Sequence, residues 1–251
     1  MFQRYAFWFI FLAPLASCQQ SATELTPTVL NAYPHDPEAF TQGLLWEDGH
    51  LYESTGLNGR SSLREVDLES GEVIRIFPLA ETYFGEGLAE VDGDLIQITW
   101  RSGEAFRYDL ETFELLDTYR YDTEGWGLCF DGETLYMTDG TATLYRRDPE
   151  TFELLSETQV TSDGEPLRYL NELECVGSHV YANVWQTDQI VQIDKDTGRV
   201  TARIDASTLS DESGRRADPN AVLNGVAYNP ETETFYVTGK LWPTLFEVTF
   251  D

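Results

Sequence analysis

The segment Gln42-Gly43-Leu44 decides the fold of this chain, because four related segments follow it. Each pairs a polar or aromatic residue with an aliphatic one and precedes a turn and an apolar run that contains Tyr or Ile. The later segments are Glu86-Gly87-Leu88, Trp126-Gly127-Leu128, Asn171-Glu172-Leu173 and Asn224-Gly225-Val226. By subtraction of the first positions, the spacings are 44, 40, 45 and 53 residues. A period of about 40–50 residues with several short strands is typical of a β-propeller, so five repeats predict five blades.

Each repeat contains segments that predict four short antiparallel strands, separated by turn signals such as Asp48-Gly49. The last repeat is one strand short, and Thr28–Tyr33 has the residues to supply the missing strand. We therefore expect an all-β, five-bladed propeller whose ring is closed by the N-terminal strand, which removes a free sheet edge. The polar stretch 207–220 is an insertion that explains the longest spacing. A β-sandwich, the rival all-β architecture, would not explain the repeat.

The N-terminal residues predict an export signal. Arg4 precedes an apolar run over residues 5–15, which is too short to span a bilayer. The run ends in Leu15-Ala16-Ser17-Cys18, an order that resembles a bacterial lipobox. Residues 1–18 are therefore predicted to be a lipoprotein signal peptide with Cys18 as the lipidated residue. An ordinary secretory signal with an incidental cysteine is the alternative.

Three regions follow from this division: the signal peptide, a polar tether over residues 19–27, and a single propeller domain over residues 28–251. Both interpretations of the signal place the domain outside the cytoplasm, and the lipobox adds a lipid anchor in a bacterial membrane. The expected location is the periplasm or the cell surface. In that oxidising setting Cys129 and Cys175 stand in equivalent strands of adjacent repeats. A disulfide between them stays open, although two separate buried thiols are favoured.

The composition restricts the partners and cofactors. The net charge is −28, with 16 basic and 44 acidic residues, which argues against nucleic acid as a partner. The three histidines, His35, His50 and His179, form no ligand-like cluster in the sequence, so catalytic zinc is disfavoured. No nucleotide or redox cofactor is implied, and a structural divalent cation in the channel stays open. We expect a monomer.

The repeats differ at two sets of equivalent positions, and positions that serve only the fold should be alike. The first set opens the inner strands and contains Gln42, Glu86, Trp126, Asn171 and Asn224. The second set follows the second strands and contains Gly56, Trp100, Gly140, Trp185 and Lys240. Together they place one carboxylate, one ammonium group, three carboxamides and three indoles around one rim of the channel. Each has a structural explanation by itself, but their shared register predicts a small-ligand site.

These residues lie in segments that closely resemble the plant and bacterial type of glutaminyl-peptide cyclotransferase, a family of five-bladed propellers. The matching segments, in order over nearly the whole predicted mature domain, are YPHDPEAFTQGL from Tyr33, ESTGLNGRSSLR from Glu53, FGEGL from Phe84, QITW ending at Trp100, GWGL from Gly125, LNELE from Leu170, YANVW ending at Trp185, VLNGVAY from Val222 and VTGKLWP ending at Pro243.

The resemblance implies an acyltransferase that converts the N-terminal Gln of peptides or proteins into pyroglutamate and releases ammonia. It implies Glu86 as the catalytic acid/base, with Asn171 and Lys240 as polar partners in catalysis. The residues that it implies for substrate binding are Phe40, Gln42, Trp100, Trp126 and Trp185.

The chemistry suits these residue types. An α-amino group with a pKa of about 7.7–8.0 must lose a proton before it attacks, and the leaving nitrogen must gain one. One carboxylate can carry that proton. The chief rival is a non-catalytic propeller lipoprotein that binds peptides or glycans, and a propeller hydrolase or lactonase with a metal-bound water is a second.

Overall fold

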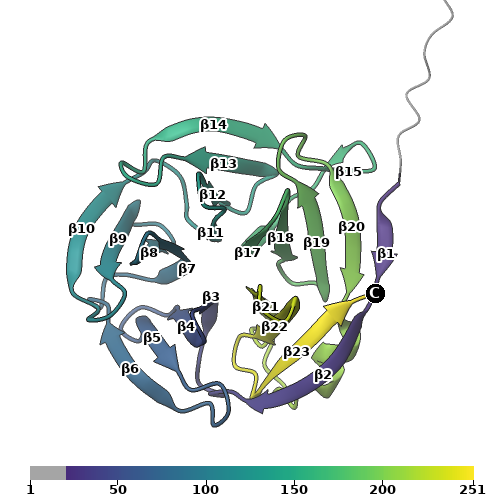
Figure 1. Ribbon diagram of the computed structural model, residues 1–251, viewed down its shortest axis with the longest axis horizontal. Coiled ribbons are helices and arrows are strands. Elements are labelled where there is room, and N and C mark those ends of the chain that lie inside the picture. The colour runs from purple at the N-terminus through teal and green to yellow at the C-terminus, as the bar shows by residue number, and fades with distance from the viewer. Residues whose placement is uncertain (1–20) are drawn as a thin grey trace, which may run out of the picture.

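The computed structural model describes residues 21–251, so the predicted signal peptide and its lipobox Cys18 lie outside the described residues. Five sheets surround a central axis (Figure 1). Within each sheet the strands lie side by side, with one strand at the axis and the last at the rim. This arrangement is the five-bladed β-propeller that the repeat predicts. The inner strands are β3, β7, β11, β17 and β21. Four of them begin one residue before their repeated segment, and β11 begins at Leu128, the last residue of its segment.

The first three blades each use four consecutive strands. Blade 1 has β3 (Thr41–Glu47), β4 (His50–Thr55), β5 (Ser62–Val66) and β6 (Val73–Pro78). Blade 2 has β7 (Gly85–Val91), β8 (Asp94–Thr99), β9 (Glu104–Asp109) and β10 (Leu115–Arg120). Blade 3 has β11 (Leu128–Phe130), β12 (Leu135–Met137), β13 (Thr143–Arg147) and β14 (Leu154–Gln159). A small hairpin of β15 (Thr161–Ser162) and β16 (Glu165–Pro166) follows.

The last two blades involve the N-terminal part of the chain. Blade 4 has β17 (Leu170–Val176), β18 (His179–Val184), β19 (Gln189–Asp194) and β20 (Val200–Asp205), with β1 (Thr23–Leu25) at its edge. The helix α1 (Ser207–Glu212) lies between the two blades in sequence. Blade 5 has β21 (Leu223–Asn229), β22 (Thr234–Gly239), β23 (Thr244–Phe250) and β2 (Pro27–Pro34).

Ring closure by the N-terminal strand is confirmed, because β2 pairs antiparallel with β23. His35, directly after β2, reinforces the closure. Its Nδ1 lies 2.7 Å from the carbonyl oxygen of Trp242 in blade 5, and its Nε2 lies 3.2 Å from Oε1 of Glu53 in blade 1. His35 thus joins the first and last blades and does not line the central pocket described below.

The tether prediction is corrected for the residues from Thr23 onward. Strand β1 pairs in parallel with β20, with Thr23 opposite Ala202 and Leu25 opposite Ile204. Leu25 also packs against the hydrophobic cluster between blades 4 and 5. The outer edge of blade 4 offers unpaired backbone groups, and the added strand satisfies them.

The preference for two separate thiols is also wrong. Cys129 on β11 and Cys175 on β17 form a disulfide, with Cα atoms 5.5 Å apart. The inner strands of neighbouring blades converge toward the axis, which brings these positions within bonding distance although 46 residues separate them.

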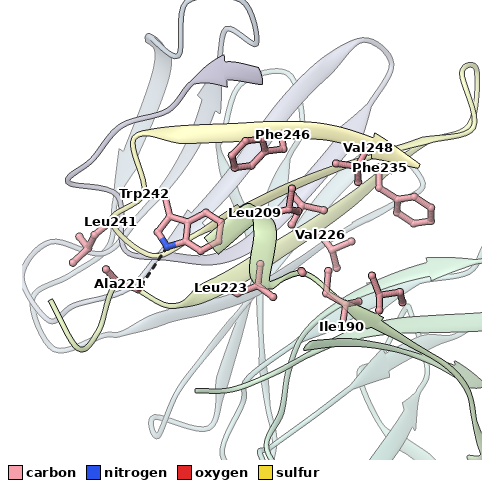
Figure 2. Close-up of a cluster of buried hydrophobic side chains, with 13 residues drawn as sticks. Ile190, Leu209, Ala221, Leu223, Val226, Phe235, Leu241, Trp242, Phe246 and Val248 are labelled. Carbon is pink, nitrogen blue, oxygen red and sulfur yellow. Dashed lines mark hydrogen bonds between the residues drawn. The ribbon is translucent and has the colours of Figure 1, made fainter. Parts of the chain in front are cut away.

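The polar insertion contains the helix α1, which the strand-based interpretation of the sequence did not predict. Leu209 and Ser210 are buried, and Leu209 joins the cluster of Trp242, Phe246 and their neighbours (Figure 2). The indole nitrogen of Trp242 donates a hydrogen bond of 3.3 Å to the carbonyl oxygen of Ala221. The insertion is therefore anchored to the body of blade 5. Among the described residues, no helix has the length and apolar character that a membrane crossing requires.

Candidate active site

The candidate site lies where the inner strands begin, and β-bulges shape it. In β7, Gly85 pairs with Thr99 but Leu88 pairs with Gln97, so the register shifts across Glu86. Equivalent register shifts occur in the other inner strands that carry a polar residue there, at Gln42, Asn171 and Asn224. A bulge turns a side chain away from the ordinary alternation of a strand. It thereby frees these side chains to lie beside the axis.

The second set of positions follows the second strands, directly in four blades and three residues after β12 at Gly140. Trp100 and Lys240 donate backbone N–H bonds to the carbonyl oxygens of Phe84 and Val222, at 3.0 and 2.9 Å. These bonds hold the loop residue beside the start of the inner strand. The two glycines of this set allow aromatic rings to pack against the backbone: a Cβ at Gly56 would strike the ring of Phe84, and one at Gly140 would strike the indole of Trp126.

These elements enclose a mainly apolar pocket of about 190 Å³ at the axis. All eight residues predicted for catalysis and substrate binding line it. The complete lining is Phe40, Gln42, Phe84, Glu86, Trp100, Trp126, Asn171, Trp185, Gln186, Pro219, Asn220, Val222 and Lys240. Asn224 from the first set lies behind the lining, where it supports Gln42.

A hydrogen-bonded relay holds the carboxylate of Glu86, which is 4% exposed. Nε2 of Gln42 donates to Oε1 of Glu86 at 3.0 Å. Nδ2 of Asn224 in turn approaches Oε1 of Gln42 at 3.2 Å and the carbonyl oxygen of Thr41 at 3.0 Å. Because its carboxamide oxygen is engaged by Asn224, Gln42 presents its amide nitrogen to Glu86. The side chain of Gln42 is therefore an orienting group as well as part of the pocket wall.

Burial shifts the two ionisable groups of the pocket in opposite directions. It raises the pKa of Glu86 well above its ordinary value, the charge of Lys240 opposes this rise, and the charge of Glu124 adds to it. Burial lowers the pKa of Lys240 to about 8, and the charge of Glu86 opposes that change. Both shifts favour the neutral form of each group, and perturbed pKa values of this kind are typical of functional sites.

Aromatic rings form most of the wall. Phe84 lies 6.0 Å from Phe40 and 5.4 Å from Trp100 between ring centroids, and Trp126 lies 5.5 Å from Trp185. Nζ of Lys240 lies 5.0 Å from the ring centroid of Phe40. The wall excludes water on several sides, which strengthens each electrostatic interaction inside the pocket.

Glu124 fastens two of these indoles from outside the pocket. Its Oε2 accepts hydrogen bonds from Nε1 of Trp100 at 2.8 Å and from Nε1 of Trp126 at 3.0 Å. Its Oε1 accepts from Nε of Arg101 at 2.9 Å, and the guanidinium of Arg101 lies 3.7 Å from the ring centroid of Trp100. Burial raises the pKa of Glu124, but these hydrogen bonds outweigh burial and lower it overall. Glu124 is therefore a charged clamp on the pocket wall.

One polar atom in the pocket is buried without a partner among the described residues. Oδ1 of Asn171 accepts no hydrogen bond there, although the side chain is only 3% exposed. An unpaired buried acceptor carries a free-energy cost that a ligand N–H relieves. Asn171 therefore offers a binding contact to a donor such as an amine or an amide.

Sequence reasoning missed Phe84, Glu124 and the insertion residues of the lining. Phe84 stands two residues before Glu86, as Phe40 stands two before Gln42, and that equivalence was a usable signal. Glu124 stands two residues before Trp126 but acts through contacts to loops of two blades, which no local pattern reveals. Asn220 and Pro219 belong to the insertion, which has no counterpart in the other repeats. Within residues 21–251, no cluster of three or more His, Cys, Asp or Glu side chains is arranged to hold a metal ion.

Fold and site together define a propeller with a small apolar pocket that contains one acid/base pair. The sequence profile of the family described as Glutamine cyclotransferase matches residues 6–250. The chain belongs to this family.

Two relatives agree with this assignment. The chain is 41% identical over 225 residues to a glutaminyl-peptide cyclotransferase of Arabidopsis thaliana, covering 88% of this chain and 70% of that protein. It also matches the crystal structure of Myxococcus xanthus glutaminyl cyclase with a TM-score of 0.88 and 39% identity, covering 92% of this chain and 99% of that one. The chain is accordingly an enzyme of the acyltransferase class.

Proposed function

We propose that this enzyme converts the N-terminal glutamine of peptides and proteins into pyroglutamate and ammonia, with Glu86 as the proton carrier. The observation that carries the proposal is the single buried carboxylate beside Lys240 in a pocket of about 190 Å³. Such a pocket accommodates one terminal residue. The names of the two relatives agree with this substrate class.

The proposed reaction needs one proton to cross the pocket. The α-amino nitrogen of the substrate attacks the carbon of its own side-chain carboxamide, and the Glu86 carboxylate accepts the proton that the amine loses. The C–N bond to the carboxamide nitrogen then breaks, and Glu86 donates its proton to that nitrogen, which leaves as ammonia. A carboxyl group whose pKa is raised by burial is a stronger base than an exposed one, which suits the acceptance of the amine proton.

The remaining polar groups stabilise charge and orientation. Negative charge develops on the carboxamide oxygen, and the ammonium group of Lys240 is the cationic donor in the lining that stabilises it. The unpaired Oδ1 of Asn171 accepts an N–H of the substrate amine. Trp100 and Trp126, held by Glu124, keep the flexible glutamine side chain bent toward its own amine.

A direct assay tests this proposal. Purified protein is mixed with a Gln-initiated dipeptide amide, and ammonia release and peptide mass are followed. We expect the peptide to lose the mass of one NH₃, with Glu86→Gln folded but nearly inactive. Equal rates for both proteins would retain the reaction but reject Glu86 as its proton carrier.

Two other functions predict different results. A non-catalytic propeller would bind Gln-peptides without releasing ammonia. A hydrolase or lactonase that uses a metal-bound water would lose activity after exhaustive chelation, whereas we propose that the chain's own side chains carry the reaction without a cofactor. Activity that survives chelation would support our proposal over that alternative.

We further propose that the protein is a monomeric lipoprotein outside the cytoplasm, anchored through Cys18. The Leu15-Ala16-Ser17-Cys18 order supports the anchor, and the Cys129–Cys175 disulfide suits an oxidising compartment. Incorporation of a labelled fatty acid, lost in Cys18→Ala, tests the anchor. Light scattering of the detergent-free, signal-less protein tests the monomer.

A further inference from the structure

A second cavity of about 480 Å³ adjoins the central pocket. It shares Gln186, Pro219 and Val222 with the pocket lining, so the two spaces lie side by side. One wall is the loop after β18, which includes Thr187 and Asp188, and the other is the insertion, from Arg215 to Asp218. We refer to this space, lined by residues 186–188, 215–219 and 221–222, as the insertion groove.

Side-chain contacts hold the two walls together. Oγ of Ser210 on α1 donates a hydrogen bond to Oδ1 of Asp188 on the facing loop. On the insertion, Nη1 of Arg215 donates to the carbonyl oxygen of Ala221 at 2.9 Å, and its guanidinium lies 5.8 Å from the ring centroid of Trp242. The groove is therefore a formed surface and not a gap between unattached loops.

The insertion is also tied to the segment between β2 and β3. Nη2 of Arg216 donates to the carbonyl oxygen of Pro37 at 2.6 Å and to Oε1 of Glu38 at 2.9 Å. Pro37 and Glu38 precede Phe40, which lines the pocket. The insertion thus spans from blade 4 to the start of blade 1 along the rim, and the groove runs beneath it.

The geometry of the proposed substrate requires an exit from the pocket. A terminal glutamine buried at Glu86 still carries a carbonyl carbon, from which the rest of the peptide must continue. The groove meets the pocket at three residues and has more than twice its volume. Its lining mixes amide, hydroxyl, carboxylate and guanidinium groups, which pair with peptide N–H and C=O groups.

We propose that the insertion groove binds the peptide residues that follow the terminal glutamine. This inference rests on the proposed function and adds a substrate class: the enzyme prefers peptides longer than two residues over dipeptides. Because extended peptides advance about 3.3–3.6 Å per residue, a pentapeptide carries roughly 10 Å more chain toward the groove than a dipeptide does.

The test compares two substrates with the full-length protein: Gln-Ala amide and a pentapeptide amide that begins Gln-Ala. We expect kcat/KM to be about tenfold higher for the pentapeptide, a difference of about 1.4 kcal/mol, and to arise mainly from a lower KM. Ala217→Trp fills the groove from the insertion, and Thr187→Trp fills it from the facing loop. Both should reduce the pentapeptide-to-dipeptide ratio toward one.

The control is Ala32→Trp, the same substitution at an exposed position of the outer strand β2, which should retain the native ratio. Because each variant's own dipeptide rate is the reference, a general loss of folded protein cancels in the ratio. A native ratio near one, or a native-like ratio in both groove variants, would overturn the groove proposal while leaving the cyclase proposal intact. A native protein inactive toward both peptides would overturn the cyclase proposal, and the groove proposal with it.

Discussion

The two mouths of the central channel are built from opposite ends of the same inner strands, yet they differ in almost every property. The strand starts surround the pocket of about 190 Å³, with its aromatic wall and single Glu–Lys pair. The strand ends surround a wider cavity of about 550 Å³, whose lining includes five acidic residues: Glu47, Glu90, Asp92, Asp131 and Glu174. One mouth is thus built for a small ligand, and the other is a strongly acidic surface.

The connections explain the difference. At the acidic mouth, tight hairpins join the inner strand to the next one, and Asp48 and Gly49 both have positive φ, as such turns require. These turns are short and place carboxylates toward solvent. At the pocket mouth, strand bulges and longer loops allow side chains from all five blades to converge. The candidate active site thus lies at the end where the backbone departs from the regular repeat.

A buried carboxylate lies between the two mouths. Glu172 is fully buried, and its two oxygens accept backbone N–H bonds from Leu44 at 3.2 Å and Val226 at 2.8 Å. It therefore joins inner strands of three blades at the axis. Burial raises the pKa of Glu172 well above its ordinary value, although both hydrogen bonds oppose this rise. Glu172 is in the centre of the fold and does not line either mouth.

The largest effect is expected from matched substitutions at the two ends of β7. Glu86→Gln should lower kcat about 10²–10⁴-fold, because it removes the proposed proton carrier without changing the size of the side chain. Glu90→Gln, at the acidic mouth, should leave kcat unchanged. Steady-state ammonia release measures both, and circular dichroism checks the fold. An equal loss in Glu90→Gln would break the functional contrast between the mouths.

Removal of the disulfide should separate stability from activity. The disulfide closes a loop of 46 residues beside the acidic cavity. Its loss is expected to lower the free energy of unfolding by about 4 kcal/mol, because the unfolded chain gains conformational entropy. In the Cys129→Ala, Cys175→Ala double variant, urea denaturation should show this decrease in the free energy of unfolding. Well below the unfolding midpoint, kcat should equal that of the native protein. A change in kcat there would mean that the two mouths are coupled.

The pH profile of kcat/KM should shift in opposite directions when charges near Glu86 are removed. The positive charge of Lys240 lowers the pKa of Glu86, so Lys240→Met should move the acidic limb to higher pH. The negative charge of Glu124 raises that pKa, so Glu124→Gln should move the limb to lower pH. Each shift should be about one pH unit or less, because these charges are secondary to burial.

These profiles also identify Glu124 as a positioning residue. A purely structural role would lower the rate at every pH without moving the limb. Glu90→Gln serves as the control, with an unchanged limb expected. Shifts in the same direction for both Lys240→Met and Glu124→Gln would contradict the assignment of the acidic limb to Glu86.

The last effect concerns the pH dependence of stability at the acidic mouth and leaves activity unaffected. Burial raises the pKa of Glu174 from 4.5 to about 8. A group with a raised pKa in the folded state contributes its full stability below about pH 4.5, and that contribution is lost as the pH rises toward 8. Glu174→Gln should therefore stabilise the protein at pH 7–8, and the melting temperature should vary less between pH 5 and 8. A variant that is less stable at pH 8 would contradict this sign.

Much of the candidate site was predictable because the repeat sets the height of each residue along the axis. Glu86 and Asn171 occupy equivalent positions at the starts of inner strands, and Lys240 belongs to the set that follows the second strands. Ring symmetry brings both sets together at one mouth. Ring closure by β2 was predictable for the same reason, since a missing strand in the last repeat must come from elsewhere.

Contacts between non-equivalent parts of the chain were not predictable. The Cys129–Cys175 disulfide depends on how closely β11 and β17 approach at the axis. The pairing of β1 with β20 depends on the open edge of blade 4, which no local pattern reveals. The clamp by Glu124 depends on two indoles from different loops that point the same way.

By itself, the sequence determined the number of blades, because its regular period reports on three-dimensional position. The motifs that resemble the family, and not the period, determined the family and the eight predicted residues of the pocket. Only the tertiary structure decided the register shifts that turn Glu86 toward the axis, the disulfide, and the groove beneath the insertion. Each of these depends on distances between segments far apart in the chain, and packing sets such distances where the periodicity is broken.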